Sequence, residues 1–187
     1  MELQRVNVKI FVDGQLTVSL ERLIEVFHRW IREKAVGDLL LDVADYRHVP
    51  NGPSVLLVGD EADFCMDQTG GRWGLLYNCK VGIDGTNDQR LSQAFTTAAK
   101  ACKLLEEEFA SEGPLRFSRN EFEIVINDRS VATNTDETFE ACQDDLEAFV
   151  TRALGHREYT FDREVDPRRR FGVTVKSAKP FELSPLA

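Results

Sequence analysis

The segment from residue 54 to residue 80 constrains the fold most, because apolar and polar residues alternate along it on both sides of a Thr-Gly pair. Successive residues of a strand point to opposite faces, so this pattern is typical of strands with one buried face. Gly70 can adopt the positive φ that a tight hairpin turn requires. A two-residue turn there would pair Phe64 with Leu75 on the apolar face. The segment therefore predicts an antiparallel hairpin that packs its apolar face against a helix.

Acidic residues are frequent in the first half of this hairpin, at Asp60, Glu61, Asp63 and Asp67. Strand alternation would place Asp60 on the same face as Phe64, where it could lie at the edge of the core or accept a charged partner, and the other three carboxylates on the opposite face. A calcium-binding loop has a defined order of acidic residues around a central glycine, and the segment lacks that order. We therefore expect a solvated acidic face, partly neutralised by Arg72 and Lys80, rather than a divalent cation site.

Three other stretches carry apolar residues at spacings of three and four, which is typical of amphipathic helices. The expected N-caps are Ser19 for the first helix and Asn87 or Asp88 for the second. For the third helix, Asn134 with Glu137 three residues later forms a capping-box pattern. Each helix has one apolar stripe, so each is expected to cover part of a sheet.

Further strands are predicted at residues 6–13, 39–43, 117–127, 158–164 and 171–176. Together these elements predict an α+β fold with a mostly antiparallel sheet of about six or seven strands. The three amphipathic helices are expected to pack mainly on one face of that sheet. Residues 1–179 are expected to form a single α+β domain, followed by a loose C-terminal tail at residues 180–187.

The order of elements repeats weakly along the chain. Residues 10–13 lead through a short loop into a helix, a glycine and a strand, and residues 124–127 do the same. This echo indicates a possible internal duplication around a pseudo-two-fold axis. The alternative is two ordinary units of similar order, and neither interpretation specifies an activity.

The charge of the chain limits the class of partner. The formal net charge is -9 and the pI is about 4.9. Such a charge disfavours general binding to nucleic acid, whose phosphates attract clustered Lys and Arg. No segment approaches the roughly 18 consecutive apolar residues that span a bilayer, and the first residues do not resemble a signal peptide. We expect a cytoplasmic protein with no membrane association.

Common catalytic and cofactor motifs are absent from the sequence. It contains no GxxxxGK[ST] phosphate loop, no GxGxxG after a strand, no HExxH and no GxSxG. The four cysteines form no CxxC pair, so they are expected to be buried thiols in a reducing compartment. The sequence therefore predicts no metal site and no cofactor.

One polar cluster that could carry chemistry contains Asp45 and His48, next to the loop at residues 50–53. A histidine near a carboxylate at the end of a strand has the parts of a general base or a metal site. The alternative is that both side chains belong to a half-exposed strand and are hydrated. Asp45 and His48 are the candidate catalytic residues.

A second polar cluster consists of three consecutive arginines, Arg168, Arg169 and Arg170. Arginines in one turn could bind a phosphate, a carboxylate or an acidic partner, and these three are the candidate ligand-binding residues. The alternative is that they pair with carboxylates of the same chain, such as Asp162, Glu164 and Asp166. The two interpretations differ in whether a guanidinium group is left for a ligand.

Two classes of function follow from these observations. The first is a non-enzymatic binding or assembly protein that acts as a homodimer or as a subunit of a complex, with Trp30 and Trp73 as possible interface anchors. The alternative is an enzyme or a small-ligand-binding protein with a site near Asp45, His48 and the loop at residues 50–53. The three arginines could contribute to that site.

Overall fold

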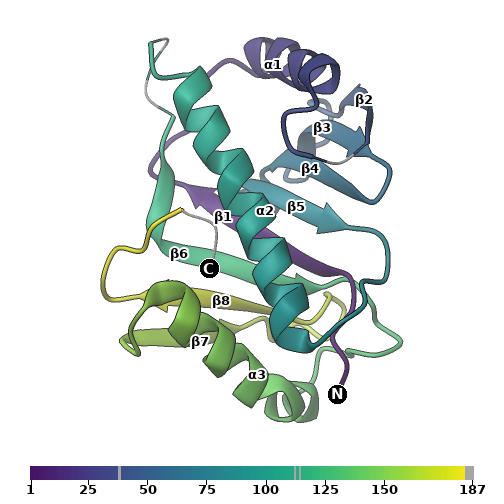
Figure 1. The fold of residues 1–187 in the computed structure, drawn as a ribbon, viewed down its shortest axis with the longest axis vertical. Helices are drawn as coiled ribbons and strands as arrows, with labels where there is room; N and C mark the ends of the chain where they lie inside the picture. The colour runs from purple at the N-terminus through teal and green to yellow at the C-terminus, as the bar shows by residue number, and fades with distance from the viewer. Residues whose placement is uncertain (38, 112, 114, 184–187) are drawn as a thin grey trace.

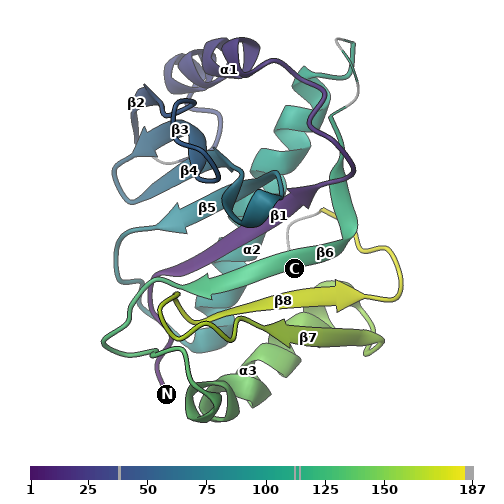
Figure 2. The same cartoon turned by 180° about the vertical axis from the view of Figure 1, so that it is seen from behind.

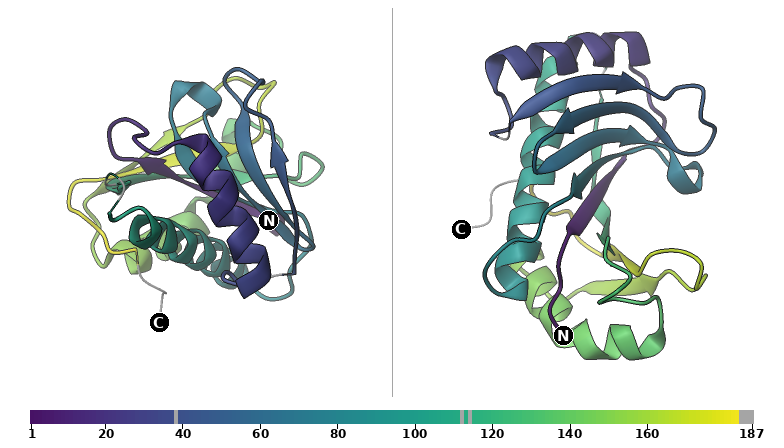
Figure 3. Two further views of the ribbon diagram at one scale, coloured as in Figure 1. Left: turned by 90° about the horizontal axis from the view of Figure 1, so that it is seen from above. Right: turned by 90° about the vertical axis from the view of Figure 1, so that its right-hand side faces the viewer.

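The computed structural model describes residues 1–37, 39–111, 113 and 115–183. Within these residues, eight strands form one antiparallel sheet, and three helices lie against one of its faces (Figures 1 and 3). The predicted α+β class, the antiparallel sheet and the three helices are confirmed. The sheet contains one strand more than the upper limit expected from the sequence. None of the helices in the described ranges is long and apolar enough to cross a bilayer.

The sheet has β1 and β6 near its centre and β2 and β7 at its edges. The strands are β1 (Val6–Val12), β2 (Leu40–Asp45), β3 (Pro53–Gly59), β4 (Ala62–Asp67), β5 (Gly74–Cys79), β6 (Phe117–Ile126), β7 (Tyr159–Arg163) and β8 (Gly172–Ser177). The helices are α1 (Leu20–Glu33), α2 (Asn87–Glu108) and α3 (Asp136–Leu154). The strand order is β2-β3-β4-β5-β1-β6-β8-β7, and every neighbouring pair is antiparallel.

The two parts of the sheet follow similar paths, from a central strand through a helix to an edge strand and back, although the first part has two more strands (Figure 2). From central β1 the chain passes through α1 to edge strand β2, and then returns through β3 and β4 to β5, which pairs with β1. From central β6 it passes through α3 to edge strand β7, and then returns to β8, which pairs with β6. The paths agree with the repeated order noted in the sequence, whereas descent from a duplication stays a prediction.

The predicted hairpin is in fact three strands. A tight turn at Asp60 and Glu61 separates β3 from β4, and the backbone N–H of Asp60 donates to the carbonyl of Leu39 at 2.8 Å. Asp60 is exposed in this turn, so its expected place at the edge of the core is wrong. Two consecutive acidic residues are compatible with a turn and also with a continuous strand. The alternation of apolar and polar residues does not distinguish the turn from the strand.

The register of the β4–β5 hairpin also differs from the prediction. Phe64 pairs with Tyr77 and not with Leu75, a shift of two residues. The connection is longer than two residues, because Gly70 and Gly71 both adopt positive φ (75° and 74°) within a short 3₁₀ turn. A shift by an even number of residues keeps every side chain on its predicted face, so the apolar face still packs against the helices.

Two of the three helix caps lie one residue away from their predicted positions. Ser19 caps α1 as predicted, by accepting a hydrogen bond from the helix backbone. Helix α2 is capped by Thr86 and not by Asn87, and α3 is capped by Thr135 and not by Asn134. The two asparagine side chains bind other segments instead, since one accepts a backbone N–H from the chain before β1 and the other donates to a carbonyl between β7 and β8.

Aromatic side chains fill the core between the helices and the sheet. Trp30 is only 1% exposed, so the expectation that it anchors an interface is wrong. Its side chain belongs to the apolar stripe of α1, which faces the sheet. The cysteines are buried free thiols, as expected, at Cys65, Cys79, Cys102 and Cys142.

The first residues of the expected loose tail are packed on the core. Phe181 and Leu183 are 3% and 4% exposed. The ring of Phe181 lies 6.0 Å from that of Phe95 and 5.5 Å from that of Phe122, centroid to centroid. Aromatic contacts of this kind add to the burial of apolar surface, so the chain is held beyond β8. Residues 184–187 lie outside the described residues.

Candidate functional site

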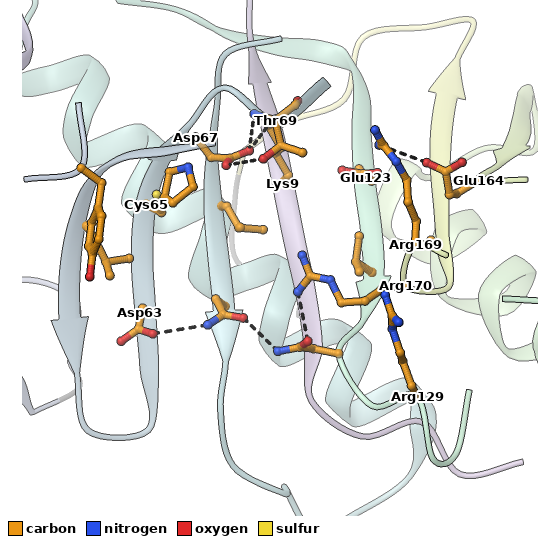
Figure 4. A pocket seen from close by; sticks show the side chains of 18 of the residues that line it. Lys9, Asp63, Cys65, Asp67, Thr69, Glu123, Arg129, Glu164, Arg169 and Arg170 are labelled. Carbon is orange, nitrogen blue, oxygen red and sulfur yellow. Dashed lines mark hydrogen bonds and ion pairs between the residues drawn. The ribbon is translucent and has the colours of Figure 1, made fainter. Parts of the chain in front are cut away.

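The face of the sheet opposite the helices carries a cavity of about 840 Å³. We call it the open-face cavity (Figure 4). Tyr46 and Pro53, in and beside the β2–β3 loop, line one side of it. The turn between β7 and β8 lines the other side, together with Arg129 from the turn after β6. The cavity therefore joins two segments that the sequence singled out separately, the loop at residues 50–53 and the arginine turn.

Side chains that alternate with the core residues form the floor of the cavity. Much of the floor is apolar, and its members are Leu56, Cys65, Leu76 and Val125. Each lies one position away from a buried residue that faces the helices, as strand alternation requires. The cavity thus has an apolar surface on which the body of a ligand could lie.

A row of amide side chains crosses the sheet at one end of the cavity (Figure 4). The Asn78 oxygen accepts hydrogen bonds from Asn7 at 2.7 Å and from Asn127 at 3.3 Å. The Asn78 nitrogen donates to Asp63 at 3.3 Å. At the other end of the row, Arg170 Nη1 donates to Asn127 Oδ1 at 3.0 Å. The row fixes the position of Arg170 relative to the floor.

A buried ion pair closes the opposite end of the cavity. Lys9 Nζ lies 2.6 Å from Asp67 Oδ2, and both side chains are at most 5% exposed. The same ammonium group donates to the carbonyls of Arg72 at 2.8 Å and Thr69 at 3.2 Å. An ammonium group has three protons, so these three acceptors use all of them.

The predicted solvated face is therefore wrong at Asp67, which is buried with Lys9, and Arg72 pairs with Glu121 instead of the hairpin carboxylates. The expected partner Lys80 does pair with Asp63 at 2.8 Å.

Glu123 lies on β6 directly across from Lys9, but it does not share in that network. Its carboxylate lines the cavity and makes no hydrogen bond within the described ranges. Burial raises the pKa of Glu123, and the charge of Asp67 adds to the rise, whereas Lys9 and Arg170 oppose it. A carboxylate without donors in a partly dry site is costly to keep ionised. Glu123 is therefore the least satisfied charged group in the cavity.

The arginine turn divides into paired and unpaired members. Arg168 contacts Asp166 at 2.7 Å, and Arg169 contacts Glu164 at 3.2 Å, so the interpretation of internal pairing is confirmed for these two. Arg170 has no carboxylate partner among the residues that the structure describes, and its contact is the amide of Asn127. All three line the cavity. Whether they bind a ligand stays a prediction.

Sequence reasoning missed three charged residues of the cavity: Lys9, Glu123 and Arg129. Arg129 donates to the carbonyl of Arg168 and, in the described part of the chain, pairs with no carboxylate. The antiparallel pairing of β6 with β8 brings these two turns together. That pairing was the missing information, because a single arginine in a polar turn has no motif of its own.

Of the predicted catalytic pair, Asp45 ends β2 and His48 lies in the following connection to β3; both are exposed and neither lines the cavity. Three hydrogen bonds of 2.7–3.0 Å from the Arg47 guanidinium hold the Asp45 carboxylate. They lower the pKa of Asp45 to about 2, with the Arg47 backbone N–H as a second cause. The carboxylate is thus held by Arg47 rather than by His48.

The remaining reactive side chains show what the cavity can do chemically. Burial raises the pKa of Cys65 to about 12, so its thiol stays protonated near neutral pH. Across the described residues, no three His, Cys, Asp or Glu side chains are grouped to hold a metal ion.

No protein-family model matches the chain, and no curated protein is significantly similar to it. The role of the cavity must therefore be inferred from its geometry.

Proposed function

We propose that this chain is a non-enzymatic binding protein that holds a small organic anion in the open-face cavity. The observation that carries the proposal is the pair Arg129 and Arg170, which line the cavity and have no carboxylate partner among the described residues. Arg32, Arg116 and Arg157 also lack a carboxylate partner in the described ranges, but they do not line the cavity. The apolar floor beside Arg129 and Arg170 would take the hydrocarbon or aromatic part of the ligand.

The chemistry of arginine favours an anionic group as the ligand's anchor. A guanidinium group presents a planar fork that matches carboxylate, sulfonate or phosphate oxygens. Hydrogen bonds to charged groups each contribute about 1.5–3 kcal/mol. The contact between Arg170 and Asn127 occupies one of its N–H groups, which leaves others for a ligand. An apolar floor with two charged groups beside it is the usual composition of a site that binds a small organic molecule.

Other groups in the cavity support a binding role over a catalytic one. The Cys65 thiol is protonated, and therefore a poor nucleophile. Asp67 is held by Lys9, and Asp63 is held by Lys80 at 2.8 Å. Groups committed to ion pairs are poorly placed to transfer protons. The buried free thiols also support the proposal that the protein works in the cytoplasm.

The proposal can be tested with a fluorescent anion and its neutral counterpart. We expect 1-anilinonaphthalene-8-sulfonate to bind saturably, with one site per chain, and to bind at least tenfold more tightly than the uncharged N-phenyl-1-naphthylamine. Replacing Arg129→Gln and Arg170→Gln together should remove this preference, because it removes the two charges that face the sulfonate. Binding is measured by fluorescence titration, and the fold of each variant by circular dichroism.

The matched control is Arg157→Gln combined with Arg32→Gln, which removes the same charge from exposed positions outside the cavity. The control should bind both dyes as the native protein does. If the sulfonate shows no saturable site, or if the cavity variant keeps the preference, the proposal is wrong.

Self-association is a second candidate function, and the rim of the open face favours it. Val165, in the β7–β8 turn, is 74% exposed, and Tyr46 and Val49, in the β2–β3 connection, are 41% and 37% exposed. Apolar side chains on two opposite rims could meet those of a second copy across a two-fold axis. Trp73 is partly buried against the core, so it is a weaker anchor than Val165.

A further inference from the structure

Glu123 sits where an ion pair with its cross-strand neighbour would be expected. Lys9 and Glu123 are directly opposite on β1 and β6, and their side chains point to the same face. Opposite charges in such positions normally attract. The Lys9 ammonium group instead donates its three hydrogen bonds to the Asp67 carboxylate and to the backbone carbonyls of Thr69 and Arg72. The nearest cation is therefore fully used by other acceptors.

The other neighbours of Glu123 do not replace Lys9. Its cross-strand partner on β8 is Thr174, and Thr174 donates no hydrogen bond to the Glu123 carboxylate. Arg169, on the same side of the cavity, is paired with Glu164 (Figure 4). Arg170 donates to Asn127 and acts on Glu123 only through its charge. The carboxylate is thus left facing the cavity with acceptor capacity that the described chain does not use.

The spacing along β6 separates this carboxylate from the unpaired arginines. Glu123, Val125 and Asn127 lie on the same side of the strand, and Asn127 is the residue that fixes Arg170. Four residues of strand span roughly 13 Å. Between the two ends lies the apolar side chain of Val125. The cavity thus has an acceptor end, an apolar middle and a donor end.

We infer that Glu123 binds a protonated amine of the ligand, so that the ligand of the open-face cavity is a zwitterion with an anionic end, an apolar middle and a cationic end. This inference rests on the proposed function, since Arg129 and Arg170 supply the anion site. An ammonium group of the ligand would donate hydrogen bonds to Glu123, which Lys9 does not. The pKa of Glu123, which partial burial raises, agrees with this reading, because it marks a carboxylate that has lost part of its hydration. An anion without a hydrogen-bond donor at that end would leave Glu123 without a partner.

Two matched probes test the inference. One is 6-methylnaphthalene-2-sulfonate, and the other is 6-(aminomethyl)naphthalene-2-sulfonate, which differs by an amine that is protonated at pH 7. We expect the amine to tighten binding to the native protein at least tenfold, as one charge-assisted hydrogen bond would. In Glu123→Gln this gain should disappear, while binding of the methyl probe stays within about twofold. Isothermal titration calorimetry measures both dissociation constants.

Glu121→Gln is the matched control, because Glu121 lies on the same strand and face but pairs with Arg72 outside the cavity lining. It should keep the full gain from the amine. The comparison of two probes on the native protein does not depend on any variant folding.

The possible failures are distinguishable. If the methyl probe binds through Arg129 and Arg170 but the amine adds nothing, or if its gain survives in Glu123→Gln, the zwitterion inference is overturned and the anion proposal stands. If the methyl probe does not bind, or binds equally well without the two arginines, both are overturned.

Discussion

Lys9 connects three segments of the open face. Its ammonium group ties β1 to Asp67 at the end of β4 and to two carbonyls of the following turn, so one side chain holds three segments. Seen in the sequence, Lys9 is only the polar member of an alternating strand. Its burial could not be predicted, because the covering turn is about sixty positions away in the chain.

Removing Lys9 should cost much of the stability of the protein. In Lys9→Met the Asp67 carboxylate stays buried without its cation, and breaking such a pair costs about 3–5 kcal/mol. Urea denaturation followed by circular dichroism gives the change in the free energy of unfolding. Lys176→Met is the control, since Lys176 pairs with Asp162 on the same face but both side chains are more than half exposed. That pair should contribute little to stability, because solvent screens it, and equal losses in the two variants would contradict the assigned role of Lys9.

Among the elements, the β4–β5 hairpin shows that apolar–polar alternation specifies which face each side chain occupies, but not which residues of the two strands are paired. Alternation predicted the two faces correctly, but it is unchanged by a shift of two residues. The register is instead set by the connection, in which Gly70 and Gly71 both take positive φ. The helix caps show a related limit, because Thr86 and Asn87 are both good caps and long-range contacts of Asn87 decide between them.

The turn glycines should therefore contribute to stability through their backbone conformation. Gly71→Ala should destabilise the protein by about 1–2 kcal/mol, since a left-handed conformation is unfavourable for a residue with a Cβ, although nothing lies within 4 Å of the added methyl group. Thermal and urea unfolding measure the loss. Gly82→Ala is the matched control, because Gly82 has no positive φ and its added Cβ would meet the Gln4 side chain only at 3.5 Å. A larger loss in the control would show that the turn conformation is not the cause.

At the scale of the whole molecule, the sequence predicts the class of the fold but not the site. Local periodicity is enough for three helices on one face of an antiparallel sheet. The open-face cavity depends on which strands become neighbours, because the pairing of β6 with β8 brings Arg129 and Arg170 to the same cavity. Strand order is a long-range property and leaves little trace in local patterns. The predicted arginine turn lines the cavity, whereas Asp45 and His48 lie outside it.

The candidate self-association is also a property of the whole molecule. If the rims of the open face pair, light scattering after size-exclusion chromatography should give twice the chain mass of 21.2 kDa. Val165→Glu should then shift the protein to the monomer mass, because it places a charge in the apolar rim. Leu39→Glu, next to edge strand β2 and 62% exposed in the native chain, should leave the dimer intact. A monomeric native protein, or dissociation by Leu39→Glu alone, would contradict pairing through the open face.

The central place of β1 has a consequence for the biosynthesis of the protein. β1 leaves the ribosome before its neighbours β5 and β6, which follow only at residues 74–79 and 117–126. During that interval its apolar face and both of its backbone edges are unpaired, a condition that exposes nascent strands to aggregation. Pairings this distant in sequence also form slowly. The sheet therefore closes late in translation, and a shielding chaperone would matter most while the segment between β1 and β6 is being made.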